Sequence, residues 1–422
     1  MPAPYDQIRE ANIRGYGEFT HHLAFLGKLY SERTHFIFEL LQNAEDAGAQ
    51  KVVFRLRSEC LEVLHDGRVF DDADVRGICG VSEGTKPDDL TKIGKFGIGF
   101  KSVYAYVAIP EIHSGGEHFR IEHYVRPFKA PSLPVEPPFT TVFHLSFAAE
   151  RVAPVQAHRE IEAALRKLSP TTLLFLRQIE TVVIQIDEVE IARVSRKVRR
   201  READHVRHVA IEADTVMGGT EDWLVFDRPL GWVSEISNNL RVEVAFRLLQ
   251  DGSTGRYHVG GIQQSPLVVF FPTEKPSNLG FLIQGPFRTT PARDNVPVAD
   301  PENAKLVVET AELIGDSLRW LRQNGMLRIA VLEAMPIRVE QFPEGGMFRP
   351  IYDRVAAVVT DEPLLPTHVG EQDGADFASG AVVRAAGSAE LRRLLTSDQL
   401  TNLLESPTPV RWLSGEITAD KT

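Results

Sequence analysis

The first third of the chain mixes helical and strand-like patterns. Apolar residues between positions 36 and 44 recur at helical spacing and predict a helix over residues 31–47. Apolar runs predict strands near residues 51–56, 61–64, 119–125 and 141–147. Gly, Ser, Asp and Pro dominate residues 71–89, which predicts a loop, and three glycines precede an apolar run at residues 103–109, which predicts a helix.

The remaining two thirds begin with strands and end with helices. Residues 152–168 predict a helix, and alternating patterns predict strands at 182–186, 223–226, 242–249 and 267–271. Asp300 and Pro301 are typical of a helix start, and apolar residues continue that helix. Residues 360–380 resemble a loop, and residues 388–395 and 398–404 predict two short helices. The pattern indicates an α/β protein, specifically an α+β two-layer sandwich, with domains at 1–150, 151–330 and 331–422.

Composition supports a globular protein of two or three domains. The chain has 422 residues, of which 43% are hydrophobic and 25% charged, and this excludes disordered, collagen-like and disulfide-scaffold proteins. Only two cysteines occur, Cys60 and Cys79, which suits a reducing compartment. The charged N-terminus lacks the apolar stretch of a signal peptide, and residues 103–109 are too few to span a membrane. We therefore expect a cytoplasmic protein with no membrane partner.

The first predicted helix carries a polar face with candidate chemistry. Glu39, Asn43 and Asp46 are spaced i, i+4 and i+7, so they share one face. A carboxylate one turn from an amide oxygen offers a base for water and a ligand for Mg²⁺. The alternative interpretation of this face is an ordinary solvated surface.

Two further motifs follow at the ends of predicted elements. Asp66 and Gly67 follow a strand, where they form either a tight turn or a carboxylate site that a ligand approaches closely. Gly94, Gly97 and Gly99 precede an apolar segment, so their N–H groups are placed to bind an anion at a helix start. The glycine spacing matches neither the Walker loop nor the dinucleotide-binding motif.

The order of these motifs resembles the GHKL (Bergerat-fold) ATPase superfamily, which includes gyrase B subunits, MutL proteins, the ninety-kilodalton heat-shock chaperone and sensor kinases. The segments ELLQNAEDAGA at residues 39–49 and KIGKFGIGFKSVY at residues 92–104 look closest to its sacsin-type, chaperone-like branch. The resemblance covers residues 19–147. Relatives of this branch are often much longer, so the polar end at residues 415–420 fits an excised N-terminal portion.

This resemblance implies a role for each matching residue. Glu39 would activate the attacking water, and Asn43 would bind Mg²⁺. Asp66 would accept the amine of adenine with support from Thr141, and Asp46 would brace the base or ribose. Residues 71–93 would form a lid over the nucleotide. The remaining cofactor-binding residues would be Gly67, Gly94, Gly97, Ile98, Gly99, Phe100 and, through its charge, Lys101.

The match to the superfamily has two departures and one extension. Val69 occupies a position where the family usually has glycine, and Thr140 precedes Thr141 where the family often has Gly-Thr. The strand-rich region would be the companion domain that supplies a cation to the γ-phosphate. Arg293 is the favoured candidate for that cation and Lys275 the weaker one, with an ordinary loop arginine as the alternative.

A basic segment at residues 193–207 has two interpretations. It contains six arginines and one lysine, which are typical either of a solvated strand face or of a contact with nucleic acid. The net charge of −11 disfavours general nucleic-acid binding. We therefore favour the solvated face.

The motifs together predict an Mg²⁺-dependent ATPase. ATP binding and hydrolysis would drive a lid and domain switch in a chaperone-like protein, and ATP closure would favour a homodimer. The alternative is a regulatory or scaffold module of a defence or nucleic-acid assembly that binds ATP with little hydrolysis. A sensor kinase is disfavoured because the chain lacks a companion helix with a phospho-acceptor histidine.

Overall fold

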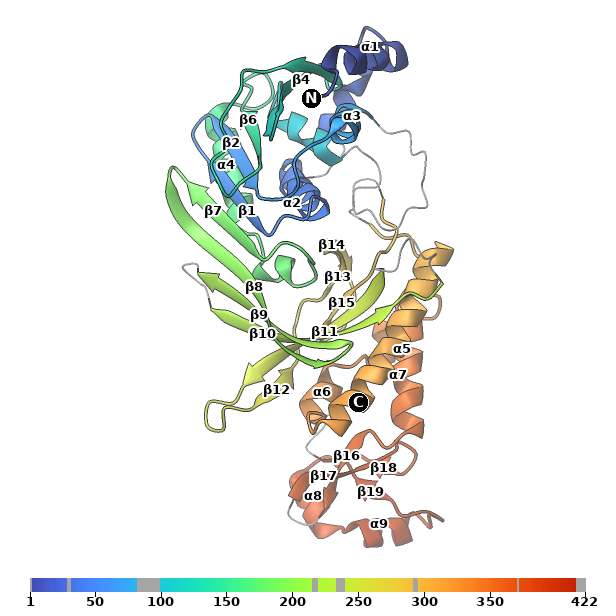
Figure 1. Cartoon of the computed structure of the whole chain (residues 1–422). Helices are drawn as coiled ribbons and strands as arrows, with labels where there is room; N and C mark the ends of the chain where they lie inside the picture. The colour runs from blue at the N-terminus through green and yellow to red at the C-terminus, as the bar shows by residue number, and fades with distance from the viewer. Residues whose placement is uncertain are drawn as a thin grey trace. The chain divides into compact units, whose positions relative to one another are not determined.

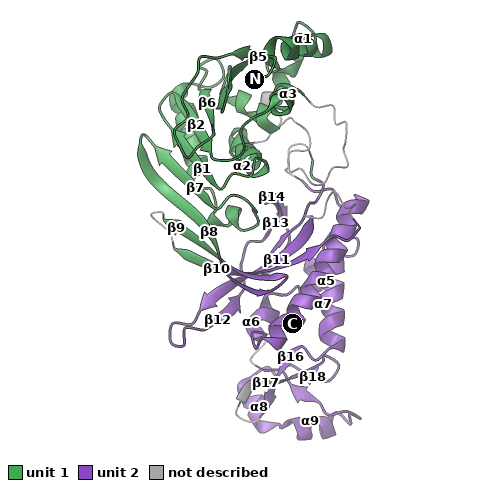
Figure 2. Ribbon diagram, viewed as in Figure 1, with its two compact units in different colours: residues 1–198, 210–221, 289–294 green, residues 199–209, 222–288, 295–422 purple. Residues whose placement is uncertain are grey.

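The computed structural model describes residues 2–28, 32–81, 99–214, 219–232, 240–290, 295–369 and 372–414. Within these ranges the protein is a mixed α/β molecule, as the sequence predicted (Figure 1). It divides into two compact units, each assembled from several segments of the chain (Figure 2). The first unit contains residues 1–198, 210–221 and 289–294, and the second contains residues 199–209, 222–288 and 295–422.

The first half of the chain supplies four α-helices and eight strands. The helices are α1 (Tyr5–Tyr16), α2 (Phe36–Asp46), α3 (Asp72–Cys79) and α4 (Pro154–Arg166). Short 3₁₀ segments are η1 (His21–Lys28), η2 (Arg33–His35), η3 (Gly99–Ala105) and η4 (Pro170–Leu173). The strands are β1 (Lys51–Leu56), β2 (Cys60–His65), β3 (Glu111–Ser114), β4 (Glu117–Glu122), β5 (Arg126–Lys129), β6 (Thr141–Ser146), β7 (Thr181–Ile186) and β8 (Val189–Ala203).

The second half supplies the remaining strands and most of the helical residues. Its strands are β9 (Val206–Asp214), β10 (Thr220–Pro229), β11 (Arg241–Gln250), β12 (Tyr257–Gly260), β13 (Pro266–Val269), β14 (Phe271–Pro276), β15 (Leu282–Gln284), β16 (Leu365–Val369), β17 (Gln372–Ala378), β18 (Val383–Arg384) and β19 (Arg411–Trp412). Its helices are α5 (Pro301–Gln323), α6 (Ile329–Ala334), α7 (Arg349–Asp361), α8 (Ala389–Leu394) and α9 (Ser397–Leu403), and η6 is Val339–Gln341.

Fifteen strands form one mixed sheet that dominates the fold. Their hydrogen-bonded order is β14-β13-β15-β11-β10-β9-β8-β7-β1-β2-β6-β3-β4-β5, and β12 pairs with β11. β7 joins β1 in parallel, whereas β2 pairs with β1 and β6 in antiparallel fashion. The predicted domain boundaries at residues 150 and 330 stay a prediction.

The sheet of the first unit has different cover on its two faces. On one face, Phe100 of η3 contacts Phe143 of β6, with 5.8 Å between their ring centroids. On the other face, Val53, Leu64, Val142 and Val183 form an apolar cluster. Val135 and Phe139, from the proline-rich segment, pack against this cluster. The two faces of this part of the sheet are therefore covered by different segments, and the predicted two-layer arrangement stays a prediction.

A buried carboxylate ties α2 to the segment before β7. Glu45 accepts backbone hydrogen bonds from the N–H groups of Arg177, Gln178 and Ile179, at 2.6, 2.9 and 2.9 Å. A buried N–H group without an acceptor is costly, so one side chain satisfies three donors at once. The contact fixes the C-terminal end of α2 beside the sheet.

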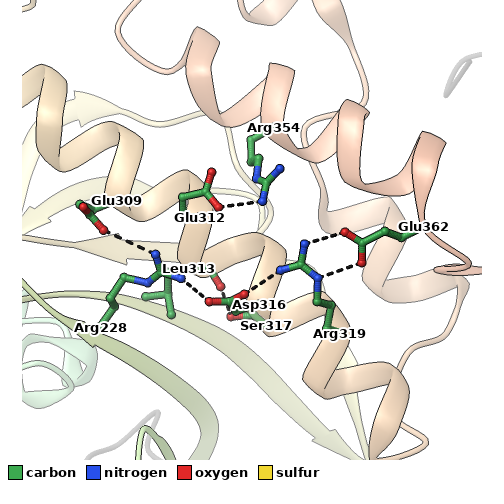
Figure 3. A network of polar contacts seen from close by, with 9 residues as sticks. All are labelled: Arg228, Glu309, Glu312, Leu313, Asp316, Ser317, Arg319, Arg354 and Glu362. Carbon is green, nitrogen blue, oxygen red and sulfur yellow. Dashed lines mark hydrogen bonds and ion pairs between the residues drawn. The ribbon is translucent and has the colours of Figure 1, made fainter.

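In the second unit, α5 begins where the sequence predicted. The Asp300 side chain accepts hydrogen bonds from the N–H groups of Glu302 and Asn303, which caps the helix. An ion-pair network then joins α5 to its neighbours (Figure 3). Arg228 of β10 contacts Glu309 and Asp316 of α5, Arg319 pairs with Asp316 and Glu362, and Arg354 of α7 pairs with Glu312. The pairs orient β10, α5 and α7 within this unit.

Three sequence expectations were wrong in their secondary structure. Residues 72–79 form the helix α3 instead of a loop, because Asp71 and Asp74 build a capping box at its start. The apolar segment after the glycines forms the 3₁₀ segment η3, which ends at Ala105. It does not form the helix that we predicted over residues 103–109. Residues 365–369 and 372–378 form the paired antiparallel strands β16 and β17 within the segment that we expected to be a loop.

We predict that Glu45→Ala lowers the free energy of unfolding by about 3 kcal/mol, because three N–H groups lose their acceptor. Urea denaturation measures the change. The matched control is Glu190→Ala, which removes an exposed carboxylate paired with Arg193 and should stay within about 0.5 kcal/mol of the unchanged chain. A Glu45→Ala value as small as the control would contradict this role.

Candidate functional site

The predicted polar face of α2 is present, and its residues differ in burial. Glu39 is 4% exposed, Asn43 is half-buried and Asp46 is exposed. His35, the residue directly before α2, has its Nε2 3.6 Å from Glu39 Oε1. The face therefore runs from a buried carboxylate at Glu39 to an exposed one at Asp46, which is unlike a uniformly solvated surface.

The Glu39 carboxylate lies directly against the backbone of Gly99. A Cβ atom on Gly99 would come within 1.8 Å of Glu39 Oε2 and within 2.6 Å of Glu39 Cδ. No Cβ fits at position 99 while the Glu39 carboxylate stays in this position, so the contact as observed depends on glycine there. The structure thereby brings together two of the predicted site residues, Glu39 and Gly99, with Phe100 following in η3.

Three buried polar side chains lie in a row across the sheet on the face that η3 covers. His65 of β2 is in register with Thr141 of β6, and Thr141 is in register with Ser114 of β3. All three are 1% exposed or less. Thr141 Oγ1 and Ser114 Oγ share a hydrogen bond of 2.6 Å, and Ser114 Oγ also accepts from the Phe70 N–H. Side chains alternate along a strand, so Phe143, two residues from Thr141, shares this face.

His65 is held as a neutral ring with a defined tautomer. Burial lowers its pKa from 6.5 to about 4, so it is uncharged at neutral pH. The Gly67 N–H donates to Nδ1 at 3.2 Å, which leaves the ring proton on Nε2. His65 was not among the predicted site residues. The signal that points to it is its position as the last residue of β2, opposite Thr141.

Asp66 and Gly67 have structural contacts at the end of β2. Asp66 Oδ1 accepts hydrogen bonds from the N–H groups of Gln50 and Lys51, at 2.8 and 2.9 Å. A Cβ on Gly67 would lie 2.7 Å from the Ala47 carbonyl oxygen, so glycine permits the close approach of this turn to the end of α2. Both residues therefore fix the turn, and the base contact predicted for Asp66 stays a prediction.

Lys101 is fully buried and its ammonium group has two carbonyl partners. Nζ donates to the carbonyl oxygens of Ile78 and Tyr124, each at 2.6 Å. Burial lowers the pKa of this ammonium from 10.5 to about 8. Lys101 thus joins η3 to the end of α3 and to the turn after β4, while its predicted contribution to phosphate binding stays a prediction.

Gln42 is a polar residue of α2 that the sequence analysis missed. It is 1% exposed, and neither its Oε1 nor its Nε2 has a hydrogen-bond partner among the described residues. It is three residues from Glu39, so helical periodicity places the two side chains on neighbouring positions of one face. A buried amide without partners is unusual in proteins, and it indicates a place where an additional polar group is accommodated.

Several predicted residues lie outside the described ranges. These are Gly94, Gly97, Ile98, Arg293 and the lid segment from residue 82 onward. Lys275, the weaker candidate cation, is half-buried on β14.

The basic segment is largely neutralised where it is described. Carboxylate partners are present for Arg193, Lys197, Arg199, Arg200 and Arg207, and Arg196 donates to backbone carbonyls. These contacts favour the interpretation as a solvated strand face.

The described ranges contain neither a cluster of metal-binding side chains nor a helix that could span a membrane. No group of three or more His, Cys, Asp and Glu side chains that could hold a metal occurs there. None of the helices described is both long and apolar enough to cross a bilayer.

We predict that Gly99→Ala and Glu39→Ala are energetically coupled. Gly99→Ala alone should lower the free energy of unfolding, because the new methyl group displaces the Glu39 carboxylate. In a Glu39→Ala background the same substitution should cost at least 1 kcal/mol less. The control Gly116→Ala is at a glycine with nothing within 4 Å of the added Cβ. Equal costs for Gly99→Ala in both backgrounds, measured by urea denaturation, would contradict the contact.

Comparisons with known proteins connect this region to one family. Residues 55–122, which include β2, α3 and η3, match the family described as Sacsin domain. Protein NO VEIN of Arabidopsis thaliana is 30% identical over 325 residues, which cover 69% of this chain and 11% of the relative. Sacsin of Homo sapiens is 36% identical over 105 residues, which cover 21% of this chain and 2% of sacsin.

One solved structure, described as the N-terminal domain of a DNA repair protein, aligns with a TM-score of 0.38 and 12% identity. The alignment covers 66% of this chain and 92% of that chain. The chain is thus similar to a small part of each of two much longer relatives, NO VEIN and sacsin, and it contains a match to the Sacsin domain.

Proposed function

We propose that the chain binds ATP with Mg²⁺ on the helix-covered face of the first unit and hydrolyses it, as the resemblance to GHKL ATPases implies. The observation that carries this proposal is the contact between Glu39 and Gly99. It places a buried carboxylate at the end of the glycine-rich segment that would hold the phosphates. The match to the Sacsin domain covers residues 55–122, which contain Gly99, and so supports this part of the proposed site.

The residues present fit a nucleotide with its metal ion in two respects. The amide of Gln42 is buried and unpartnered within the described ranges, so a polar ligand group would satisfy it. The absence of a Cβ at Gly99 lets the Glu39 carboxylate lie against the backbone of the segment that would hold the phosphates. When bound, Mg²⁺ would neutralise phosphate charge, and the Asn43 side chain would supply one of its oxygen ligands.

Glu39 is suited to act as the general base. Its carboxylate is held between the His35 ring, at 3.6 Å, and Gly99, so it has little freedom to rotate. A positioned carboxylate accepts a proton from water as the water attacks the γ-phosphate in line. Because Glu39 touches neither the base nor the sugar in this scheme, its loss should affect the chemical step and leave binding intact.

Hydrolysis would be coupled to conformational change in the full protein. Residues 82–93 of the predicted lid, Gly94, Gly97, Ile98 and Arg293 lie outside the described ranges, and their roles stay predictions. A chaperone-like switch, cytoplasmic location and dimer formation are likewise proposals for the whole protein.

We predict that Glu39→Gln retains MgATP affinity within about threefold and lowers the hydrolysis rate at least 100-fold, because general-base catalysis contributes about 10²–10⁴-fold. Calorimetry measures binding and phosphate release measures hydrolysis. The control Glu10→Gln changes an exposed carboxylate of α1 and should alter neither.

Asn43→Ala should weaken nucleotide binding in the presence of Mg²⁺ much more than in EDTA, because the lost group binds through the metal. Binding of MgATP without measurable hydrolysis by the unchanged chain would favour a regulatory module over an ATPase. Absence of any nucleotide binding would contradict the proposal as a whole.

A further inference from the structure

We propose that Thr140 is a positioning residue for base recognition: its hydroxyl group fixes the turn that carries Asp66, so that one Asp66 oxygen is presented to the amine of adenine. This inference rests on the proposed nucleotide site and on the base contact predicted for Asp66. Selectivity for a 6-amino over a 6-oxo purine then depends on the Thr140 hydroxyl, a group that the sequence alone showed only as a departure from the superfamily pattern.

The Asp66 carboxylate has one oxygen engaged and one available. Oδ1 accepts hydrogen bonds from the N–H groups of Gln50 and Lys51, at 2.8 and 2.9 Å, and no residue within the described ranges donates to Oδ2. Two donors on one oxygen restrict the rotation of the carboxylate and leave the second oxygen for a ligand. An ionised carboxylate is only an acceptor, so Oδ2 complements an amine and not a carbonyl group.

Thr140 holds the carbonyl groups of both neighbours of Asp66. Its hydroxyl donates to the Gly67 carbonyl oxygen and also reaches the His65 carbonyl oxygen, at 3.3 Å. Its N–H donates to the same His65 oxygen at 3.0 Å. Gly67 is buried, so its carbonyl oxygen needs a donor from the protein, and the hydroxyl supplies it. Thr140 therefore fixes the backbone on either side of Asp66.

Thr140 is itself anchored to the turn between β3 and β4. The Gly115 N–H donates to the Thr140 carbonyl oxygen at 3.2 Å. Gly115 has a φ of +57°, and the Val69 side chain packs against it, since a Cβ there would lie 3.0 Å from Val69 Cγ1. The Phe70 N–H donates to Ser114 Oγ at 2.9 Å. The segment after β2 and the Thr140 backbone are thus braced by the same neighbouring turn, which keeps the hydroxyl in place.

The test compares MgATP with MgITP, which carry a 6-amino and a 6-oxo group, by calorimetry with the whole chain. The unchanged chain should bind MgATP at least tenfold more tightly, because Asp66 Oδ2 accepts from the amine and repels the 6-oxo oxygen. Thr140→Val removes the hydroxyl and should lower this ratio at least threefold, since a hydrogen bond contributes roughly 2- to 13-fold to an equilibrium. Thr140→Ser retains the hydroxyl and should keep the ratio within twofold of the unchanged chain.

Further variants separate positioning from stability. A ratio of two affinities in one variant does not depend on the fraction of folded protein, so lost stability alone leaves it unchanged. Asp66→Asn keeps its oxygen for the Gln50 and Lys51 N–H groups, so its NH₂ replaces Oδ2 and should shift the ratio toward MgITP. The matched control Thr401→Val removes a half-buried hydroxyl that donates to the Ser397 carbonyl oxygen in the second unit, and should not change the ratio. Thr140→Gly, which lacks both the hydroxyl and the methyl group, replaces Thr140→Val if that variant does not fold.

Three results would overturn the inference and leave the proposed function standing. The first is a ratio in the variant without the hydroxyl that equals that of the unchanged chain. The second is a loss of selectivity in Thr140→Ser as large as in Thr140→Val. The third is equal binding of MgATP and MgITP by the unchanged chain. If the chain binds neither nucleotide, the proposed function fails first and the inference fails with it.

Discussion

A carboxylate buried against a bare backbone constrains the first unit more than any other feature. Burial of a charged group is unfavourable unless nearby groups compensate it, so Glu39 could not be retained by packing alone. Its oxygen occupies the space that a side chain at position 99 would take, with His35 at 3.6 Å on the other side. The position of α2, the start of η3 and the accessibility of the backbone at Gly99 all depend on this contact.

The sheet supplies a second constraint, which acts through register. Because β2 and β6 pair in antiparallel fashion, His65 lies opposite Thr141 and shares its face of the sheet. The buried side chain of Glu45 holds the far end of α2 with three backbone hydrogen bonds. Together these contacts bring a carboxylate, a glycine backbone and a row of small polar groups to the same side of one sheet. Nucleotide sites need such a combination of fixed polar groups and apolar walls.

Local signals explain the parts of the fold that the sequence predicted. Strands β1, β2 and β6 and helices α4 and α5 carry their own apolar periodicity, and α5 has its cap in Asp300. Helix α3 was missed because its Asp- and Gly-containing sequence resembles a loop, although Asp71 and Asp74 cap one another. The apolar pattern did not predict helix α1, because only Ile8 of its residues is buried. The position of α1 depends on contacts near β5, which is distant in the sequence.

The candidate site was predictable in its motifs and not in its individual contacts. Glu39, Asn43 and Gly99 follow from spacing and resemblance, since both are properties of short segments. The position of His65 opposite Thr141 depends on pairing with a strand about 75 residues later, which no local pattern encodes. Lys101 likewise looks like a phosphate ligand beside the glycines, and only the folded chain shows its ammonium bound by Ile78 and Tyr124. Gln42 is recognised only in the structure, where its buried amide has no hydrogen-bond partner within the described ranges.

The most direct measurement of the central claim is hydrogen–deuterium exchange of backbone amides with and without saturating MgATP. The account predicts slower exchange in α2, at the end of β2 around His65, in η3 and at the start of β6, because these segments line one site on the first unit. The strands β16 and β17 in the second unit should be unaffected. Unchanged exchange in α2 and η3 at saturating MgATP, or slowing confined to the second unit, would contradict the claim that Glu39 and Gly99 form the nucleotide site.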